Sequence, residues 1–564
     1  MHVFLLTAVL FSAAPAEELP LLSLVPEDAR LVLHVPDLGA LRSRFAGTAL
    51  GRFLADETVR GGLPAFREWI LGKRWEAAPE EEKLFLSLLE EVEGELAAFV
   101  RPREGGGDFA VLAARAGGKV RAFREVLERV KEKLPRLEKF RLSTDVFGDA
   151  RIFVLEPAGE GTGGNVLFMA EDGRTVLFAA DRDREAGMEA VRKIFDTLYA
   201  GEAEEKTILD APRFRRGRER TGGPGQGEFF VDLAAELGRG IPEGSVLSLM
   251  GLGALEYFYA RIDLEKEEPA VFFLGLAGGG LVADLAAALT SRGANDLDRY
   301  IPAGALRFGL GWIDLASMYE ASLDFLARGF GEEFARYRTF YEEKVKKRLR
   351  IDPEKELLEN LDGRTAVFTV EVPEEEMARF PERLRSEIAS DLLFPGTAYL
   401  AGLKDGDAFR AGLEKTLRAL GLYVGLHREK TASGTIFSVA VPGSGIAFYW
   451  AFHGDVFACS FFPGAIRAFL RTAAGGRGAA GPLSSLPEGY RDASCVLVAR
   501  GGGTAKLVLG LFLGLGKRLG GALGEGEAGG TGWATAAERC FAGRTVGFVL
   551  DVKDEGIYLS LVTP

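Results

Sequence analysis

The chain has 564 residues, of which 47% are hydrophobic and 27% are charged, so it is long enough for about two to four folded domains. Its formal net charge is -13, which argues against nucleic acid as a partner because phosphate binding needs a concentrated positive field. Its 73 glycines gather in clusters between periodic segments, which is typical of loop tips and excludes a fibrous repeat.

The first feature in chain order is an expected signal peptide. Residues 3–11 form a short apolar core, and small residues follow with Ala14 and Ala16 in the two cleavage positions. The core is too short to span a bilayer, and no later apolar run reaches that length. We therefore expect cleavage after Ala16 and a periplasmic or secreted protein without a transmembrane segment in the mature chain. An N-terminal strand or anchor helix is the alternative.

A recurring pattern follows, in which an extended apolar run ends in Asp-Leu and the Asp-Leu begins a helix. The copies span residues 31–38, 229–233 and 308–315, and a fourth copy at 495–499 continues into glycines. An Asp at this corner can accept hydrogen bonds from the free amides of the first helical turn. We therefore predict that Asp37, Asp232 and Asp314 are helix caps and not ligands.

Each copy is followed by a helical spacer and then by two apolar strands, the first pair being residues 94–100 and 109–114. An amphipathic helix is predicted from 119 to 134, since its apolar residues recur every three to four positions. Residues 150–155 form the next strand. A hairpin over residues 166–180 then turns at Asp172-Gly173, which is a strong turn signal.

The order of elements restarts near residue 295. Residues 301–305 match 25–29, the strand beginning at Gly363 matches the one beginning at Gly94, and a hairpin near Gly454 matches the one at Asp172. The sequence thus predicts an α+β fold of two pseudo-equivalent halves. Each half is a mainly antiparallel sheet built from strand-helix-strand-strand units, with helices packed on one face. The predicted division is 1–16 signal peptide, 17–296 first half and 297–564 second half, an internal duplication.

The residues that most often carry chemistry form no recognisable site. His34 lies in an apolar strand, His453 in a predicted hairpin turn, and no paired histidines or cysteines have zinc-site spacing. Cys459 and Cys495 lie in apolar runs that favour buried thiols, and with Cys540 they allow at most one bridge. No serine-hydrolase elbow, phosphate loop or dinucleotide fingerprint is present. We predict no catalytic, cofactor-binding or metal residues and no cofactor.

Five arginines crowd residues 213–220. Their spacing favours the solvated end of a helix and its loop over a binding patch.

Three segments carry a family resemblance: residues 24–29 (Leu-Val-Pro-Glu-Asp-Ala), 48–56 and 351–361. Together they resemble a family of exported bacterial proteins catalogued as a domain of unknown function. The resemblance covers most of the mature chain and implies an extracytoplasmic bacterial protein, with no activity or catalytic residue to carry over.

Large apolar strands without a recognisable active site favour an extracytoplasmic, non-enzymatic binding or scaffold protein, whose partner is an envelope protein or an apolar ligand. The alternative is a hydrolase of envelope polymers that uses a carboxylate pair distant in the sequence. Such a pair would lie within roughly 5 to 10 Å in a cleft. Whether the chain is an enzyme stays open, with binding the preferred reading.

Overall fold

The computed structural model describes residues 19–57, 94–103, 107–115, 140–158, 165–201, 206–237, 245, 248, 250–378, 396–440, 446–476, 492–500, 539–541, 545–553 and 556–562. The predicted signal peptide, the helix predicted at 119–134 and the glycine cluster near residue 520 lie outside these residues.

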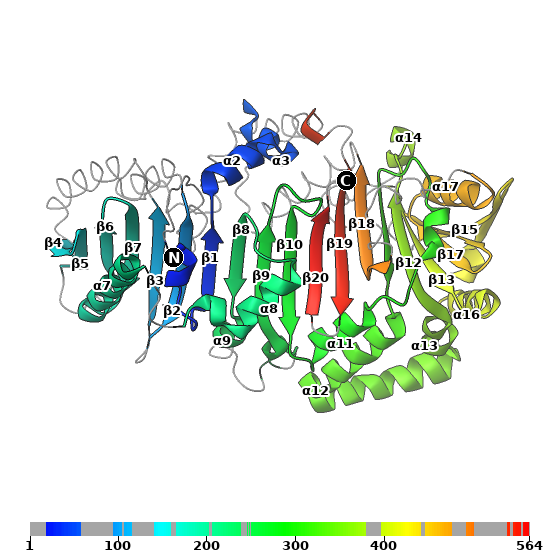
Figure 1. The fold of residues 1–564 in the computed structure, drawn as a ribbon. Coiled ribbons are helices and arrows are strands. Elements are labelled where there is room, and N and C mark those ends of the chain that lie inside the picture. Colours follow the sequence, from blue (N-terminus) through cyan, green and yellow to red (C-terminus); the bar gives the residue numbers. More distant parts are fainter. Residues whose placement is uncertain are drawn as a thin grey trace. The chain divides into compact units, whose positions relative to one another are not determined.

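The chain divides into two compact units, one of residues 1–240 with 255–275 and the other of residues 241–254 with 276–564. Both contain helices and an antiparallel sheet, which confirms the α+β class (Figure 1). The sequence analysis placed residues 276–296 in the first half, whereas their contacts group them with the second unit.

The sheet of the first unit has the strand order β4-β5-β6-β7-β3-β2-β1-β8-β9-β10. Its strands are β1 (Leu31–Val35), β2 (Leu96–Pro102), β3 (Asp108–Arg115), β4 (Phe140–Phe147), β5 (Ala150–Pro157), β6 (Val166–Glu171), β7 (Thr175–Asp181), β8 (Gly227–Val231), β9 (Leu255–Ile262) and β10 (Ala270–Leu276). Its helices are η1 (Leu21–Leu24), α2 (Leu38–Gly47), α3 (Ala49–Ala55), α7 (Arg184–Ala200), η4 (Ile208–Asp210), α8 (Pro212–Arg220) and α9 (Leu233–Leu237).

The sheet of the second unit has the strand order β14-β15-β16-β17-β13-β12-β11-β18-β19-β20. Its strands are β11 (Arg307–Trp312), β12 (Leu361–Thr369), β13 (Thr397–Leu403), β14 (His427–Thr431), β15 (Gly434–Ala440), β16 (Ala447–His453), β17 (Val456–Ser460), β18 (Cys495–Arg500), β19 (Thr545–Lys553) and β20 (Gly556–Val562). Its helices are η5 (Leu252–Ala254), α11 (Leu281–Ala288), η6 (Asp296–Tyr300), α12 (Leu315–Tyr341), η7 (Glu342–Lys347), α13 (Pro353–Glu356), η8 (Leu358–Asn360), α14 (Glu374–Met377), α16 (Gly406–Ala419), η9 (Tyr423–Gly425) and α17 (Pro463–Ala473).

The strand orders of the two units are the same, because adding ten to each strand number of the first unit reproduces the second. The backbone hydrogen bonds correspond as well. The amide of Arg30 donates to Val100 over 2.9 Å, and the amide of Leu306 donates to Thr369 over 2.9 Å. The amide before β1 and the amide before β11 thus bond to the neighbouring strand in the same way.

Helices pack on both faces of the sheets. In the first unit, Leu38 and Leu41 of α2 pack with Val35 and Leu96, whereas Phe214 of α8 packs edge-on to Phe230, at 5.5 Å between ring centroids. Side chains of successive strand residues point to opposite faces of a sheet. Val35 and Leu96 lie on one face of this sheet, and Phe230 lies on the other. The prediction that helices cover one face only is therefore wrong.

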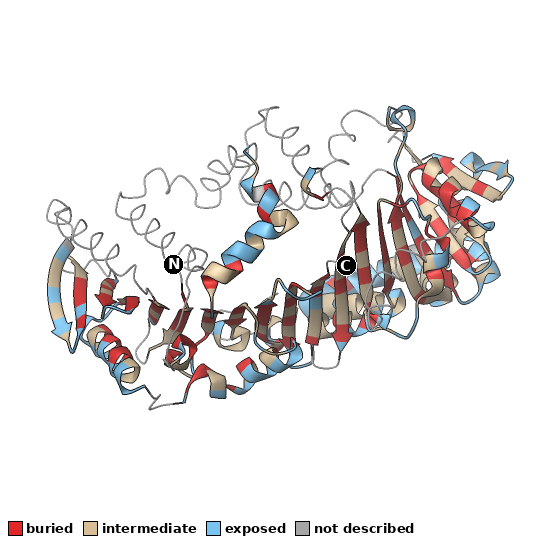
Figure 2. Ribbon diagram, turned by 45° about the horizontal axis from the view of Figure 1, so that its top comes forward, coloured by how far each residue is buried: buried red, intermediate tan, exposed pale blue. Residues whose placement is uncertain are grey.

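The second unit repeats this arrangement. Ile466 and Phe469 of α17 belong to a core with strand residues such as Phe308 and Val498, while Leu417 of α16 packs with Trp450, on the other face. Buried residues concentrate along the strands, and exposed residues lie on the outer sides of the helices (Figure 2). Helices on both sides thus bury consecutive strand residues such as Trp450 and Ala451 on opposite faces.

The predicted caps and turn are confirmed. Asp37 accepts a hydrogen bond from the amide of Ala40 over 2.7 Å, and Asp314 accepts one from Ser317 over 3.1 Å. Asp232 accepts one from the amide of Ala235 over 2.9 Å. These bonds satisfy amides that the first helical turn leaves free, so all three aspartates are helix caps. Asp172 and Gly173 lie in the tight turn between β6 and β7, with Gly173 at a φ of 91°.

Candidate functional site

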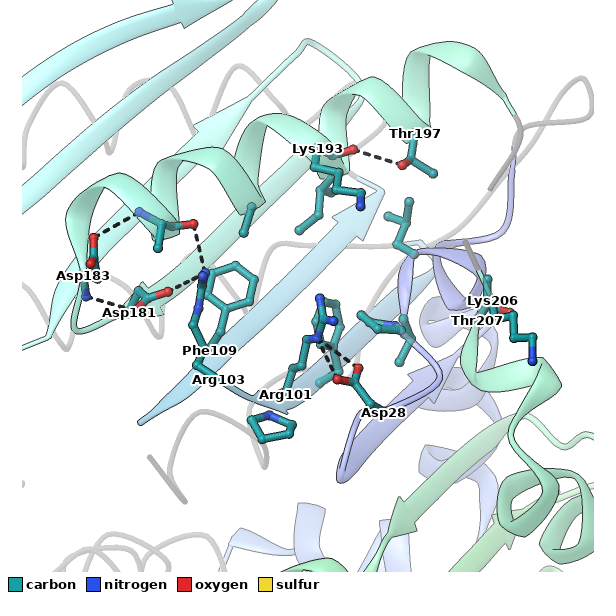
Figure 3. Close-up of a pocket in the computed structure, with 18 of the residues that line it drawn as sticks. Asp28, Arg101, Arg103, Phe109, Asp181, Asp183, Lys193, Thr197, Lys206 and Thr207 are labelled. Carbon is teal, nitrogen blue, oxygen red and sulfur yellow. Dashed lines mark hydrogen bonds and ion pairs between the residues drawn. The ribbon is translucent and has the colours of Figure 1, made fainter. Parts of the chain in front are cut away.

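A cavity of about 840 Å³ opens in the first unit, between η1 with its following segment, the ends of β2 and β3, and one face of α7 (Figure 3). It is lined by Ser23, Leu24, Val25, Pro26, Asp28, Phe99, Arg101, Pro102, Arg103, Phe109, Asp181, Arg182, Asp183, Arg184, Ala186, Ala190, Lys193, Ile194, Thr197, Lys206 and Thr207. The volume is in the range of small-molecule sites, which are commonly 300 to 1,000 Å³.

Two buried aromatic rings lie under this cavity. Phe99 of β2 and Phe109 of β3 are both buried and pack edge to face, with ring centroids 6.5 Å apart. The guanidinium of Arg103 lies over the ring of Phe109 at 4.9 Å from its centroid. Leu24 and Ile194 add aliphatic surface from η1 and α7. The cavity therefore offers apolar surface beside a held cation.

The wall opposite α7 is held by backbone contacts. Pro26 forms an isolated β-bridge with Thr207. The amide of Ile208 donates to the carbonyl of Val25 over 2.8 Å, and that of Glu27 donates to Lys206 over 3.3 Å. Since main-chain bonds fix both segments, the wall is formed without a ligand.

Positive charge dominates the cavity lining, with six Arg and Lys residues against three Asp residues. Two of the acids are held by arginines: Asp28 accepts from Nε of Arg101 over 3.0 Å, and Asp181 pairs with Nη2 of Arg103 at 2.6 Å. Figure 3 shows Arg101 beside Asp28, with Lys193 reaching in from α7. In a chain with net charge -13, this lining is a local positive field that favours anions.

A buried polar network lies elsewhere in the same unit, around His34 of β1. Nδ1 of His34 lies 3.2 Å from Oε2 of Glu228, and Nε2 lies 3.1 Å from Oε1 of Glu95. Arg218 of α8 binds Glu228 in bidentate fashion, through Nε at 2.8 Å and Nη2 at 2.7 Å. The hydroxyl of Tyr259 also donates to Glu228. The Glu228 carboxylate thus accepts bonds from three different side chains.

The protonation states of Glu228 and His34 follow from burial and from their hydrogen-bond partners. Burial disfavours the charged form of Glu228, but the hydrogen bonds from Arg218, His34 and Tyr259 outweigh burial and lower its pKa to about 2. Burial likewise disfavours the charged form of His34, yet its bonds to Glu228 and Glu95 raise its pKa. A charged His34 donates from both ring nitrogens, one to each carboxylate. Burial and the adjacent Glu228 raise the pKa of Tyr259.

The network also reaches η1, which contributes Ser23 and Leu24 to the cavity wall. Oε1 of Glu95 accepts from the amide of Leu21 over 2.7 Å, in addition to its contact with His34. This bond satisfies one of the free amides at the start of η1. The His34 network is therefore part of the support beneath the cavity.

At three positions of this network the second unit has apolar residues, whereas the counterpart of Glu95 is the charged Arg364. Register places Leu310 at the position of His34, Val496 at that of Glu228, and Gly547 at that of Tyr259. The same sheet can thus form with a hydrocarbon core, so the polar network is not a requirement of the fold. Such networks are common at functional sites, although structural networks perturb pKa values as well.

Glu95 and Glu228 are two carboxylates that approach one group, as a glycosidase pair would. The ring of His34 occupies the space between them, and the side chain of Glu228 is only 1% exposed. A substrate bond has no room between these two acids. The two carboxylates therefore bind the His34 ring and are not placed as a hydrolytic pair.

The other residues weighed from the sequence lie apart from the cavity. His453 is the last residue of β16, with its ring 6.0 Å from that of Tyr300, so the turn itself is Gly454-Asp455. His427 begins the edge strand β14. Cys459, Cys495 and Cys540 are free thiols, and burial raises the pKa of Cys459 to about 12.

The arginine-rich run differs from its predicted role. Residues 212–220 form α8, and Arg218 is turned toward the sheet, where it holds the buried Glu228. Arg213 pairs with the cap residue Asp232 at 2.8 Å. The prediction that this run is a solvated helix end is therefore wrong for the side chains of Arg213 and Arg218. The sequence signal for this role was Glu228 itself, an acid directly before Phe229-Phe230 in an apolar strand.

Among the described residues, no group of three or more His, Cys, Asp or Glu is arranged to hold a metal ion. Within the same part of the chain, no helix is long and apolar enough to cross a membrane.

Comparison with protein-family models, with curated proteins and with solved structures finds no match.

Proposed function

We propose that this chain is an extracytoplasmic, non-enzymatic binding protein and that the cavity of the first unit is its ligand site. The extracytoplasmic location is inferred from the signal-peptide pattern that ends at Ala16 and from the resemblance to exported bacterial proteins. The binding role rests on one observation, the cavity of about 840 Å³, whose wall is held by main-chain bonds of Val25, Pro26 and Glu27. A site that is already formed avoids the free-energy cost of ordering a wall when the ligand arrives.

The acids that line the cavity favour binding over hydrolysis. Asp28 and Asp181 each pair with an arginine, and Asp183 caps α7 by accepting from the amide of Ala186 over 3.0 Å. Each of these carboxylates is thus already engaged by a partner within the protein. These carboxylates therefore serve to orient arginines and to cap a helix.

We also propose that the two units arose by duplication of one unit. Support comes from the common strand order and from matched bonds outside the strands. The amide of Ala29 donates to Pro26 over 3.1 Å, and that of Ala305 donates to Pro302 over 3.0 Å. An experimental structure tests this proposal: β1–β10 should superpose on β11–β20 strand by strand, and a different strand order in either unit would refute it.

The binding role is tested by blocking the cavity. Ala190 lines it from α7, whereas Glu189 is exposed on the same helix and is not part of the lining. The mature protein and the variants Ala190→Trp and Glu189→Trp should each be incubated with an envelope extract, and retained small molecules identified by mass spectrometry. We expect a compound that the unmodified protein and Glu189→Trp retain and Ala190→Trp loses. Equal retention by all three, or retention by none, contradicts the proposal.

A further inference from the structure

A second cavity, of about 570 Å³, lies at the corresponding place in the second unit. Pro302 and Gly304 line it where Pro26 and Asp28 line the first, Val370 and Glu371 follow β12 as Arg101 and Pro102 end β2, and α17 takes the place of α7. Its lining is Pro302, Gly304, Val370, Glu371, Pro373, Glu376, Thr431, Ala432, Ser433, Gly464, Arg467, Ala468 and Arg471. The same fold thus forms a hollow twice, and the two linings can be compared directly.

The linings differ in charge. Register equates Arg101 with Val370 and Arg103 with Val372, so two cations of the first cavity have aliphatic counterparts. In the second cavity two arginines face two glutamates, and one of them, Arg467, is held by Glu429 at 3.2 Å. Because the second unit folds without this positive excess, the fold does not require the arginines of the first cavity.

We infer, on the basis of the proposed function, that the ligand of the first cavity is an amphiphilic monoanion, a single acid group on an aliphatic chain. The acid group lies by Arg101 and Lys193, and the chain lies along Pro26, Pro102 and Ala190, which are only partly buried. Arg101 suits this role because its side chain is 44% exposed while Asp28 fixes its orientation through Nε at 2.9 Å. A guanidinium oriented in this way can offer its terminal N–H groups to a carboxylate.

The acids in the lining limit the charge of the ligand. Asp28, Asp181 and Asp183 offset half of the six cations, and a polyanion would approach these carboxylates as well as the arginines. A small inorganic anion would leave the partly exposed Pro26, Pro102 and Ala190 uncovered. One acid group with an aliphatic chain satisfies both parts of the lining.

The ligand class is tested by isothermal titration of the mature full-length chain with four probes: decanoate, decanol, decyltrimethylammonium and acetate. We expect one site for decanoate, weaker binding of decanol by about tenfold, as expected for loss of a charge-assisted hydrogen bond, and no measurable binding of the other two. Added salt should weaken decanoate binding and leave decanol binding unchanged, because screening acts on the charged group alone.

Two matched variants locate the site. Arg101→Gln in the first cavity should weaken decanoate binding about tenfold without changing decanol binding, whereas Arg471→Gln in the second cavity should change neither. Decyltrimethylammonium binding as tightly as decanoate, no decanoate binding, or an unaffected Arg101→Gln would each overturn the inference. If Ala190→Trp still abolishes retention of a neutral or cationic compound, only the ligand class fails. If nothing depends on Ala190, the proposed function fails with it.

Discussion

Removing the charge of Glu228 tests the physical reading of the buried network. In the folded protein this carboxylate, 1% exposed, accepts from Arg218, His34 and Tyr259. Its pKa falls from 4.5 to about 2. At about 1.4 kcal/mol for each tenfold change in proton affinity, the fold favours the ionised form by about 3 kcal/mol. Glu228→Gln should therefore lower the free energy of unfolding of the first unit by about 3 kcal/mol.

The assay must separate the two units, because a chain with two units need not unfold in one step. Pulsed hydrogen exchange along a urea gradient, read by mass spectrometry, gives one midpoint for peptides of β1 and β8 and another for peptides of β11 and β18. Glu265→Gln is the control, since Glu265 is 62% exposed and its ion pair with Arg44 at 2.7 Å should contribute about 1 kcal/mol or less. The double variant Glu228→Gln/Arg218→Met should lose less free energy of unfolding than the sum of the losses in the two single variants, because it leaves no unpaired guanidinium. Additive losses, or a Glu228→Gln midpoint equal to that of Glu265→Gln, would refute the reasoning.

Three further predictions concern other parts of the chain. The pKa of His34 is raised, so its contribution to stability is complete below its ordinary value of 6.5 and is lost as pH rises through the folded-state pKa. Urea midpoints of the first unit should therefore fall above pH 6.5 more in the unmodified protein than in His34→Gln, and parallel profiles would contradict this. Asp314→Ala removes the cap of α12 and should lower the free energy of unfolding of the second unit by about 0.5 to 2 kcal/mol while leaving decanoate binding intact; a loss of binding in the folded variant would show that the corner is part of a site. The mature chain should begin at Glu17 in an extracytoplasmic fraction, as N-terminal sequencing can establish, and recovery of intact Met1 in the cytosol would contradict the expected address.

Strands with strong apolar patterns could be predicted from the sequence. The hairpin expected around Asp172-Gly173 is β6 and β7, and the strand expected at 150–155 lies in β5, whose Ile152 and Val154 are buried. These elements were predictable because their own residues bury one face and because the turn residues have local preferences.

Two edge strands were missed for a physical reason. β14 reads His-Arg-Glu-Lys-Thr, and β4 carries Arg141, Ser143 and Asp145 among its eight residues. Each stands at the end of its strand order, where one side pairs with a single neighbour and polar side chains discourage further pairing. Such strands depend on the hairpin partner and not on an apolar pattern of their own, so periodicity did not reveal them.

The candidate site could not be predicted from the sequence, for a different reason. Arg101 comes from β2, Arg103 follows β2, Lys193 comes from α7 and Lys206 comes from the segment before η4, so the positive field forms only when distant segments meet. His34, Glu95, Arg218 and Glu228 likewise come from separate elements. The individual residues were visible, and Glu228 within an apolar strand was a usable signal. Their convergence depends on the strand order, in which β1 lies between β2 and β8.

The most direct test of the central claim is to find where an amphiphilic anion binds. Photocrosslinking with a diazirine analogue of decanoate, followed by peptide mapping, should label segments that line the first cavity, namely β2, β3 and α7. Excess decanoate should suppress this labelling, Ala190→Trp should abolish it, and Glu189→Trp should leave it unchanged. Labelling centred on α17, or spread over both units without competition by decanoate, would contradict the account.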